Sequence, residues 1–229
     1  TGSGKTTLTR LLFRLYDPTY GAVKLSGVDA RHVELEHLRS RIGLVTQDVQ
    51  LFRGTVRDNL TFFDASVPDT RIEEVVQEMG LGAWLARQPE GLDTIIDSGG
   101  RNLSAGEAQL VAFARVFLKD PGLVVLDEPS SRLDPASERL LEVAVERLLE
   151  GRTAIIIAHR LETVERVDRI LVMGGGKVVE SGSRATLAAE PDSRYARLRR
   201  AALALDLNVT AGQTPAGLEN AADILEELA

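Results

Sequence analysis

Runs of apolar residues alternate with amphipathic stretches over the second half of the chain. The apolar runs are continuous, which is typical of strands buried on both faces of a sheet. They are LVVLDEP at 123–129, TAIIIAHR at 153–160 and RILVMGGGKVVESG at 169–182. Helical spacing of apolar residues marks the stretches at 106–118, 135–149 and 161–166. This alternation predicts an α/β fold with a mostly parallel sheet that helices cover on both faces.

The first half of the chain begins with a helical pattern and continues with strands. TTLTRLLFRLYD places leucines at helical spacing from Leu8 to Leu15, and Asp17-Pro18 is predicted to end the helix. AVKLSGVD at 22–29 predicts a short strand that runs into a Gly-Val-Asp turn. IGLVTQ at 42–47 predicts another buried strand.

The pattern also divides the chain into parts. Residues 55–88 have helical periodicity and no strand signal, so we predict an inserted helical subdomain over about 55–118. Near residue 205 a linker with Gly, Thr and Pro precedes an acidic amphipathic stretch. We therefore predict one domain at 1–204 and a linker with an acidic tail at 205–229, for which a loosely attached segment is the simpler interpretation.

Composition narrows the class of protein. The 229 residues include 27 Lys and Arg against 34 Asp and Glu, and the net charge of -7 argues against a general nucleic-acid or anionic-membrane surface. The absence of cysteine excludes disulfides and thiolate metal sites. The sequence has no apolar run near the roughly 20 residues that span a bilayer.

The opening TGSGKTT predicts a phosphate-binding loop at the N-terminus of a helix. Backbone N–H groups of a glycine-rich turn can surround phosphate oxygens where the helix carries partial positive charge. Lys5 would reach the β and γ phosphates, and the Thr6 hydroxyl would bind Mg²⁺. By itself so short a motif also fits a flexible Gly/Ser linker. The predicted nucleotide-binding residues of the loop are Gly2, Ser3, Gly4, Lys5, Thr6 and Thr7.

A pair of carboxylates at the end of LVVLDEP predicts the catalytic part of the same site. Asp127 at the end of a buried strand can hold Mg²⁺, and Glu128 can orient or deprotonate the attacking water. Alone, the pair also fits a strand that runs into an acidic helix cap. Downstream of the phosphate loop, the catalytic interpretation is favoured.

Four further motifs occur in the order found in one family. They are VTQD at 45–48, LSAGE at 103–107, SRLD at 131–134 and IIIAHR at 155–160. These resemble the Q-loop, the LSGGQ signature, the D-loop and the switch histidine of ATP-binding cassette (ABC) proteins. The chain thus resembles the nucleotide-binding domain of an ABC transporter from Thr1 to about Leu198, which implies a P-loop NTPase fold.

The resemblance implies roles for single residues in a head-to-tail dimer that sandwiches two ATP molecules. Gln47 would contact Mg²⁺ and the lytic water, and His159 would contact the γ-phosphate. Ser104 and Gly106 would bind the nucleotide of the other subunit, while Asp134 would connect the two sites. Glu128, His159 and Gln47 are therefore the predicted catalytic residues, and the predicted cofactors are ATP and Mg²⁺.

The flanking segments are most similar to those of exporters. DVQLFRGTVRDNL at 48–60 faces a coupling helix of the membrane domain in that subfamily, so Phe52 and Arg53 are candidate contacts, although Phe52 fits core packing equally well. The resemblance implies a membrane-spanning domain, which in such exporters usually precedes the cassette on the same chain. It also implies a second cassette as homodimer or heterodimer and a place at the cytoplasmic face of a membrane. It implies no nucleic-acid partner.

The chain departs from the family pattern at two signature positions and at its start. Ala105 replaces a signature glycine, which is a small change if the backbone there is helical, and Glu107 replaces a glutamine and is expected to point away from the nucleotide. The first glycine of the loop, the strand before it and an aromatic residue that stacks on adenine are absent. We therefore expect the sequence to begin inside the Walker A loop of a longer protein.

Two alternatives to an exporting ATPase remain open from the sequence. One is a module that dimerises on ATP with little turnover, as the degenerate half of a heterodimeric exporter. The other is a soluble ABC ATPase that takes no part in transport. The acidic balance disfavours a cassette that acts on nucleic acid.

Overall fold

The computed structural model describes residues 3–46, 49–127, 135–158 and 164–210. The chain divides into two compact units. We call Asp17–Ile157 the central unit and Thr1–Tyr16 together with Ala158–Ala229 the terminal unit.

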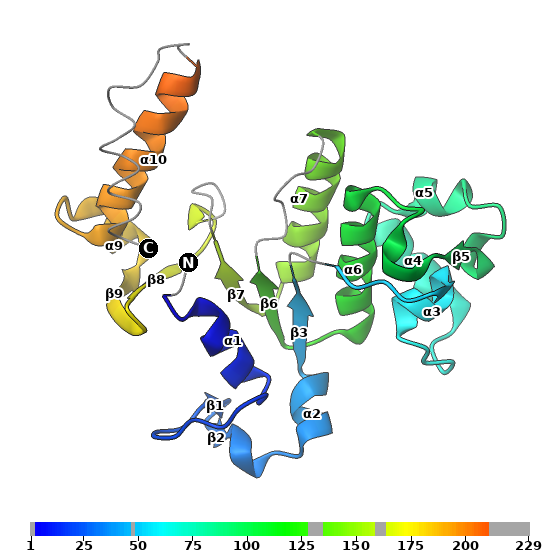
Figure 1. Cartoon of the computed structure of the whole chain (residues 1–229), viewed down its shortest axis with the longest axis horizontal. Coiled ribbons are helices and arrows are strands. Elements are labelled where there is room, and N and C mark those ends of the chain that lie inside the picture. Colours follow the sequence, from blue (N-terminus) through cyan, green and yellow to red (C-terminus); the bar gives the residue numbers. More distant parts are fainter. Residues whose placement is uncertain (1–2, 47–48, 128–134, 159–163, 211–229) are drawn as a thin grey trace. The chain divides into compact units, whose positions relative to one another are not determined.

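A three-stranded parallel sheet forms the core of the central unit (Figure 1). Its order is β3 (Ile42–Val45), β6 (Leu123–Asp127) and β7 (Thr153–Ile157). The register pairs Val45 with Leu126 and Asp127 with Ile157, so all three strands end at the same edge. The prediction of an α/β fold with a parallel sheet is confirmed.

Two long helices pack on one face of this sheet. They are α6 (Ala105–Lys119) and α7 (Pro135–Leu149). Phe113 of α6, Leu126 of β6 and Leu148 of α7 are fully buried in one hydrophobic cluster. Because side chains alternate between the faces of a strand, Leu126 and its neighbours on this face of β6 fix the position of both helices.

The contact between α6 and β3 requires a glycine at position 43, and this gives a testable prediction. A Cβ atom on Gly43 would lie 2.4 Å from Val116 Cγ1 and 2.8 Å from Pro121 Cγ. Gly43→Ala is expected to lower the free energy of unfolding by about 1–3 kcal/mol, because it overpacks this contact. Urea unfolding measures the change. Gly122→Ala is the control, since a Cβ there meets nothing within 4 Å; equal stability of the two variants would contradict the prediction.

Short elements precede β3. Strands β1 (Lys24–Leu25) and β2 (Val28–Asp29) form an antiparallel hairpin, which is followed by η1 (Ala30–His32) and α2 (Leu35–Ser40). The predicted Gly-Val-Asp turn is wrong. The turn lies at Ser26 and Gly27, whose φ angles of 51° and 83° suit a two-residue hairpin loop, and the residues after it form the second strand.

The segment between β3 and α6 is helical, as its periodicity indicates. It contains α3 (Val56–Thr61), α4 (Asp69–Glu78), α5 (Gly82–Ala86) and the 3₁₀ turns η2 (Gly91–Asp93) and η3 (Ser98–Gly100). It also contains β4 (Gly54–Thr55) and β5 (Ile95–Ile96), which pair antiparallel and which the sequence pattern did not predict. Strands of two residues are too short to show a period.

The terminal unit contains the first helix and the last part of the chain. Helix α1 (Lys5–Leu12) ends earlier than the predicted stop at Asp17-Pro18, because Phe13 caps it and Arg14 adopts a φ of 49°. The other described elements are β8 (Arg169–Gly174), β9 (Lys177–Ser183), α9 (Arg184–Ala189) and α10 (Arg194–Thr210). Strands β8 and β9 pair antiparallel, and Ile170 and Val172 of β8 pack against α9 and α10.

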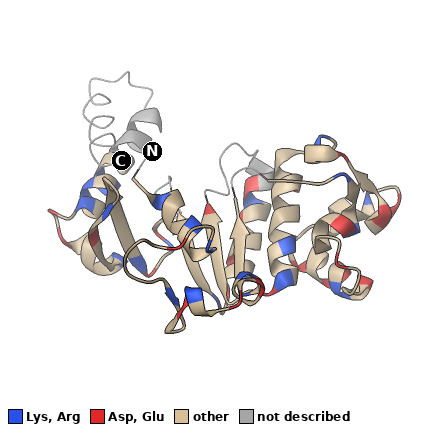
Figure 2. Cartoon of the chain, turned by 60° about the horizontal axis from the view of Figure 1, so that its bottom comes forward, with Lys and Arg blue, Asp and Glu red and all other residues tan. Residues whose placement is uncertain are grey.

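Two surface properties bear on the partners of the chain. None of the helices in the described ranges combines the length and the apolar character that crossing a bilayer requires. Lys and Arg residues are distributed over many elements and mixed with Asp and Glu (Figure 2).

Helix α10 continues across the predicted boundary at 204/205, and that division of the chain stays a prediction.

Candidate functional site

The described part of the phosphate loop is built around Gly4 in the terminal unit. Gly4 is the N-cap of α1 with a φ of 99°, a conformation that L side chains rarely adopt. The loop also lies close to the β8–β9 turn, since a Cβ on Gly4 would be 3.4 Å from Met173 Cε. A side chain at this position would therefore strain the loop, which explains the glycine.

The ammonium group of Lys5 is already oriented by the loop. Its Nζ donates to Ser3 Oγ at 2.9 Å, and Ser3 is only 2% exposed. Thr6 and Thr7, in the first turn of α1, are exposed. The loop thus combines a held cation, free hydroxyl-bearing side chains and a helix N-terminus, which is a set of groups suited to phosphate oxygens.

Asp127 lies at the sheet edge where the parallel strands of the central unit end. It is the last residue of β6, it is partly exposed, and its strand neighbour is Ile157 of β7. Ligands of open α/β sheets bind outside the carboxyl ends of their strands. The position of Asp127 therefore fits its predicted role as a metal ligand.

Ser104 and Glu107 form a capping box at the start of α6. Ser104 Oγ accepts a hydrogen bond from Glu107 N at 3.2 Å, and the Glu107 carboxylate accepts one from Ser104 N at 2.8 Å. The glutamate is therefore engaged in the helix cap, a role that glutamine also performs. Ala105 is the first residue of the helix, and the methyl group is compatible with that backbone; Gly106 follows it and is buried.

Side chains of α6 bind the chain on both sides of the Gln47 segment. Gln109 Nε2 donates to the Thr46 carbonyl at 3.5 Å, and Arg115 Nη1 donates to the Gln50 carbonyl at 2.6 Å. Neither residue was singled out from the sequence. Polar side chains inside an otherwise apolar helix were the available signal.

An aromatic cluster of Phe52, Phe62 and Phe63 lies on the surface of the helical segment. The side chains are 43%, 58% and 56% exposed, which excludes the core-packing alternative for Phe52. The Phe52 ring centroid lies 6.2 Å from that of Phe62 and 6.0 Å from that of Phe63. Phe62 and Phe63 both have left-handed φ angles, of 54° and 65°, which are unusual for bulky residues and costly to maintain.

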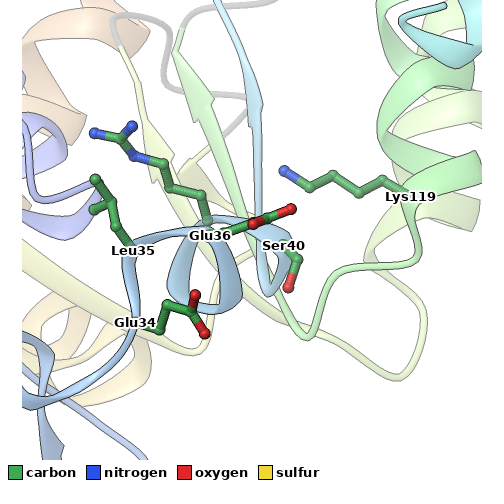
Figure 3. A pocket seen from close by; sticks show the side chains of 6 residues that line it. Glu34, Leu35, Glu36, Ser40 and Lys119 are labelled. Atoms are coloured by element: carbon green, nitrogen blue, oxygen red, sulfur yellow. The ribbon is translucent and has the colours of Figure 1, made fainter. Parts of the chain in front are cut away.

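An open hollow of about 640 Å³ lies elsewhere on the central unit (Figure 3). Its lining residues are Glu34, Leu35, Glu36, Arg39, Ser40 and Lys119. Ser40 and Lys119 precede the first residues of β3 and β6, whereas Asp127 ends β6. The hollow is therefore at the opposite edge of the sheet from the predicted site. Lys119 donates to the Ile42 carbonyl at 2.8 Å, and burial lowers its pKa.

The predicted site residues are thus distributed over both units and the undescribed segments. Ser3, Gly4, Lys5, Thr6 and Thr7 belong to the terminal unit. Ser104, Gly106 and Asp127 belong to the central unit. Gly2, Gln47, Glu128, Asp134 and His159 lie outside the described residues. Of these, Gln47, Glu128 and His159 follow the ends of β3, β6 and β7 by one or two residues in the sequence.

A comparison with protein families identifies the group to which this chain belongs. A family model described as ABC transporter matches residues 1–131. The chain belongs to the ABC transporter family. This membership confirms the predicted family and the P-loop α/β fold.

Individual ABC transporter relatives are similar over most of this chain. The ATP-dependent lipid A-core flippase of Burkholderia pseudomallei is 45% identical over 199 residues, which cover 87% of this chain and 33% of the flippase. ABC transporter B family member 21 of Arabidopsis thaliana is 38% identical over 199 residues, which cover 87% of this chain and 15% of that protein. This chain spans about a third of the length of the bacterial relative.

A solved ABC transporter structure has the same fold. The structure of a bacterial Atm1-family ABC exporter with ATP bound superposes with a TM-score of 0.76 at 36% sequence identity. The match covers 86% of this chain and 35% of the exporter chain.

Proposed function

We propose that this chain is the ATP-hydrolysing cassette of an ABC exporter at the cytoplasmic face of a membrane. The observation that carries the proposal is the sheet edge of the central unit, where β3, β6 and β7 end together with Asp127 at the last position of β6. Each of the three strands leads within two residues to one of the predicted catalytic residues. Exporter relatives and the structural match support the transport role.

The resemblance to ABC cassettes assigns the predicted site residues complementary tasks on Mg-ATP. Lys5 and the N-terminus of α1 hold phosphate oxygens, with Gly2, Ser3, Gly4 and Thr7 shaping the loop. Thr6 and Asp127 offer the hard oxygen ligands that Mg²⁺ prefers, together with Gln47. The metal ion would neutralise charge that develops on the phosphate oxygens. Glu128 would take a proton from the attacking water.

The signature residues act on a second cassette, which is either another copy of this chain or the different cassette of a heterodimer. Ser104 caps α6 and so presents its hydroxyl at the N-terminus of a 15-residue helix, where anions are favoured. In a head-to-tail dimer, Ser104 and Gly106 bind the nucleotide held by the partner's loop. His159 contacts the γ-phosphate, and Asp134 connects the two sites.

The aromatic cluster is the surface on which the membrane domain docks. Three exposed phenylalanine side chains next to one another are an unusual surface for a soluble domain, and aromatic residues commonly dominate binding energy at interfaces. The strained backbone conformations of Phe62 and Phe63 also favour a binding role over a packing role. Arg53, also exposed, borders the cluster in sequence.

Phe62→Asn in the complete transporter tests this function. Asparagine tolerates a left-handed φ, so the variant removes the ring without adding backbone strain. When the cassette and the membrane domain are expressed as two separate polypeptides and reconstituted in vesicles, the affinity between them is expected to fall at least about 30-fold, the ~2 kcal/mol of an interface hot spot. ATP hydrolysis and the fraction of cassette that copurifies with the membrane domain are the measurements.

Tyr20→Asn is the matched control, since Tyr20 is an aromatic residue of the same unit with 92% exposure and lies outside the cluster. It is expected to leave both measurements unchanged. An unmodified transporter that binds ATP and dimerises without hydrolysis would support the dimerisation module instead. A cassette that hydrolyses ATP and copurifies with no membrane domain would support a soluble ABC ATPase.

A further inference from the structure

The chain has two sulfur-bearing side chains, and both are methionines. Its 229 residues include no cysteine, and the methionines are Met79 and Met173. Met79 is 1% exposed inside the hydrophobic cluster of the central unit, whereas Met173 is partly exposed near the end of β8 in the terminal unit. Thiols and thioethers are the side chains most open to oxidation, and solvent access decides which of them react. Met173 is therefore the side chain of this sequence that a peroxide reaches first.

The methyl end of Met173 lies against the phosphate loop. A Cβ atom on Gly4 would be 3.4 Å from Met173 Cε and 3.5 Å from Gly176 Cα in the β8–β9 turn. Gly4 is the N-cap of α1, with a φ of 99°, and the next residue is Lys5. The apolar end of Met173 thus occupies the space beside the residue whose backbone conformation shapes the loop.

The geometry of β8 separates Met173 from the apolar cluster of the same strand. Ile170 and Val172 pack against α9 and α10, and successive side chains of a strand point to opposite faces. A β-bulge interrupts the pairing with β9 between Val172 and Met173. Bulges re-aim a side chain and are common next to active sites. The strand therefore presents Met173 to the loop rather than to α9 and α10.

Oxidation of Met173 would add a polar oxygen to this apolar contact. The sulfur takes one oxygen atom from a peroxide: the O–O bond breaks, an S–O bond forms and water leaves, so the sulfur loses the two electrons that the peroxide gains. The new oxygen is bonded to Sδ, the atom that carries Cε. A polar group away from water costs free energy unless a donor satisfies it. The sulfoxide either takes a donor from the loop or turns to solvent, and in both cases Gly4 loses its apolar contact.

We propose that Met173 is a modification site, at which oxidation to the sulfoxide lowers the affinity of the loop for Mg-ATP. This inference rests on the proposed function, because it concerns the loop that holds the triphosphate. A methionine sulfoxide reductase reverses the change: two thiols are oxidised to a disulfide, and the oxygen leaves as water. Since Met79 is buried and cysteine is absent, the response of this chain is confined to one side chain.

The test measures Mg-ATP binding by the complete transporter before and after treatment with hydrogen peroxide, by calorimetric titration. The dissociation constant is expected to rise about tenfold, within the cost of leaving a polar group unsatisfied. Mass spectrometry of the peptide that contains Met173 measures the oxidised fraction. The sulfoxide reductases MsrA and MsrB with dithiothreitol are then expected to restore the starting constant, and both are needed because each reduces one sulfoxide epimer.

Variants of the two methionines assign the effect to one sulfur. Met173→Leu removes the sulfur and keeps an apolar side chain of similar volume, so its dissociation constant is expected to stay at the value of its own untreated form. Met79→Leu is the matched control, and its constant is expected to rise as in the unmodified transporter. Met173→Gln places a polar side chain of similar length beside Gly4 and is expected to weaken binding without any oxidant.

An equal rise in Met173→Leu and in the unmodified transporter would overturn the inference, because the sensitive group would then lie elsewhere. An unchanged constant despite complete oxidation of Met173, or unchanged binding in Met173→Gln, would do the same. If the untreated transporter binds no Mg-ATP, the proposed function fails instead, so the two failures give different results.

Discussion

Glu128→Gln is expected to lower ATP turnover by about 10²–10⁴-fold, the usual contribution of a positioned general base. Glutamine has nearly the shape of glutamate but cannot accept a proton from the attacking water. The substitution leaves Lys5, Thr6 and Asp127, the groups that hold phosphate and metal. ATP is therefore expected to bind and to accumulate in ATP-dependent dimers that no longer dissociate through hydrolysis.

Phosphate release and analytical size exclusion with Mg-ATP measure the two effects in the complete transporter. Glu73→Gln is the control, because Glu73 is an exposed glutamate on α4 and should leave turnover unchanged. Phosphate release at the wild-type rate from the Glu128 variant would remove this residue from its role as base. Loss of both turnover and dimers would indicate a damaged fold.

The sheet was predictable because its strands are continuously apolar. β3 and β6 are largely buried, with residues such as Val45 and Leu126 that have few alternatives to a sheet interior. The same signal fixes the position of Asp127, since the apolar run ends at that residue. The chemistry of the strand ends therefore followed from the hydrophobic pattern together with the motif order.

Features that depend on a few residues or on distant contacts were not predictable. The β1–β2 hairpin depends on the left-handed angles of Ser26 and Gly27, and two-residue strands show no period. Arg115 was missed because an arginine in a helical pattern ordinarily marks a solvated face, and its acceptors are 56 and 65 residues away in the chain. The exposure of Phe62 and Phe63 likewise depends on tertiary structure, since an apolar residue in sequence predicts burial.

Lys5→Met is expected to weaken binding of Mg-ATP by at least about 30-fold. Removing one partner of a desolvated charge pair costs about 2–5 kcal/mol, and the triphosphate would lose its cationic contact in the loop. The effect is large because Ser3 Oγ already holds Nζ at 2.9 Å, so little ordering of the lysine opposes its contact with phosphate. Methionine keeps the length and the apolar stem of the side chain, which limits the change to the charge.

Calorimetric titration of the complete transporter with Mg-ATP measures the dissociation constant. Lys24→Met is the matched control, an exposed lysine in β1 of the central unit that should leave the constant unchanged. A Ser3→Ala variant separates the contribution of the orientation of Lys5 from that of its charge. It removes only the hydrogen bond that holds Nζ, worth about 0.5–1.5 kcal/mol, so it should weaken binding by about 2- to 13-fold. An unchanged affinity for Mg-ATP in Lys5→Met would show that the loop is not the phosphate site. If Ser3→Ala loses as much affinity as Lys5→Met, Ser3 itself contacts the nucleotide.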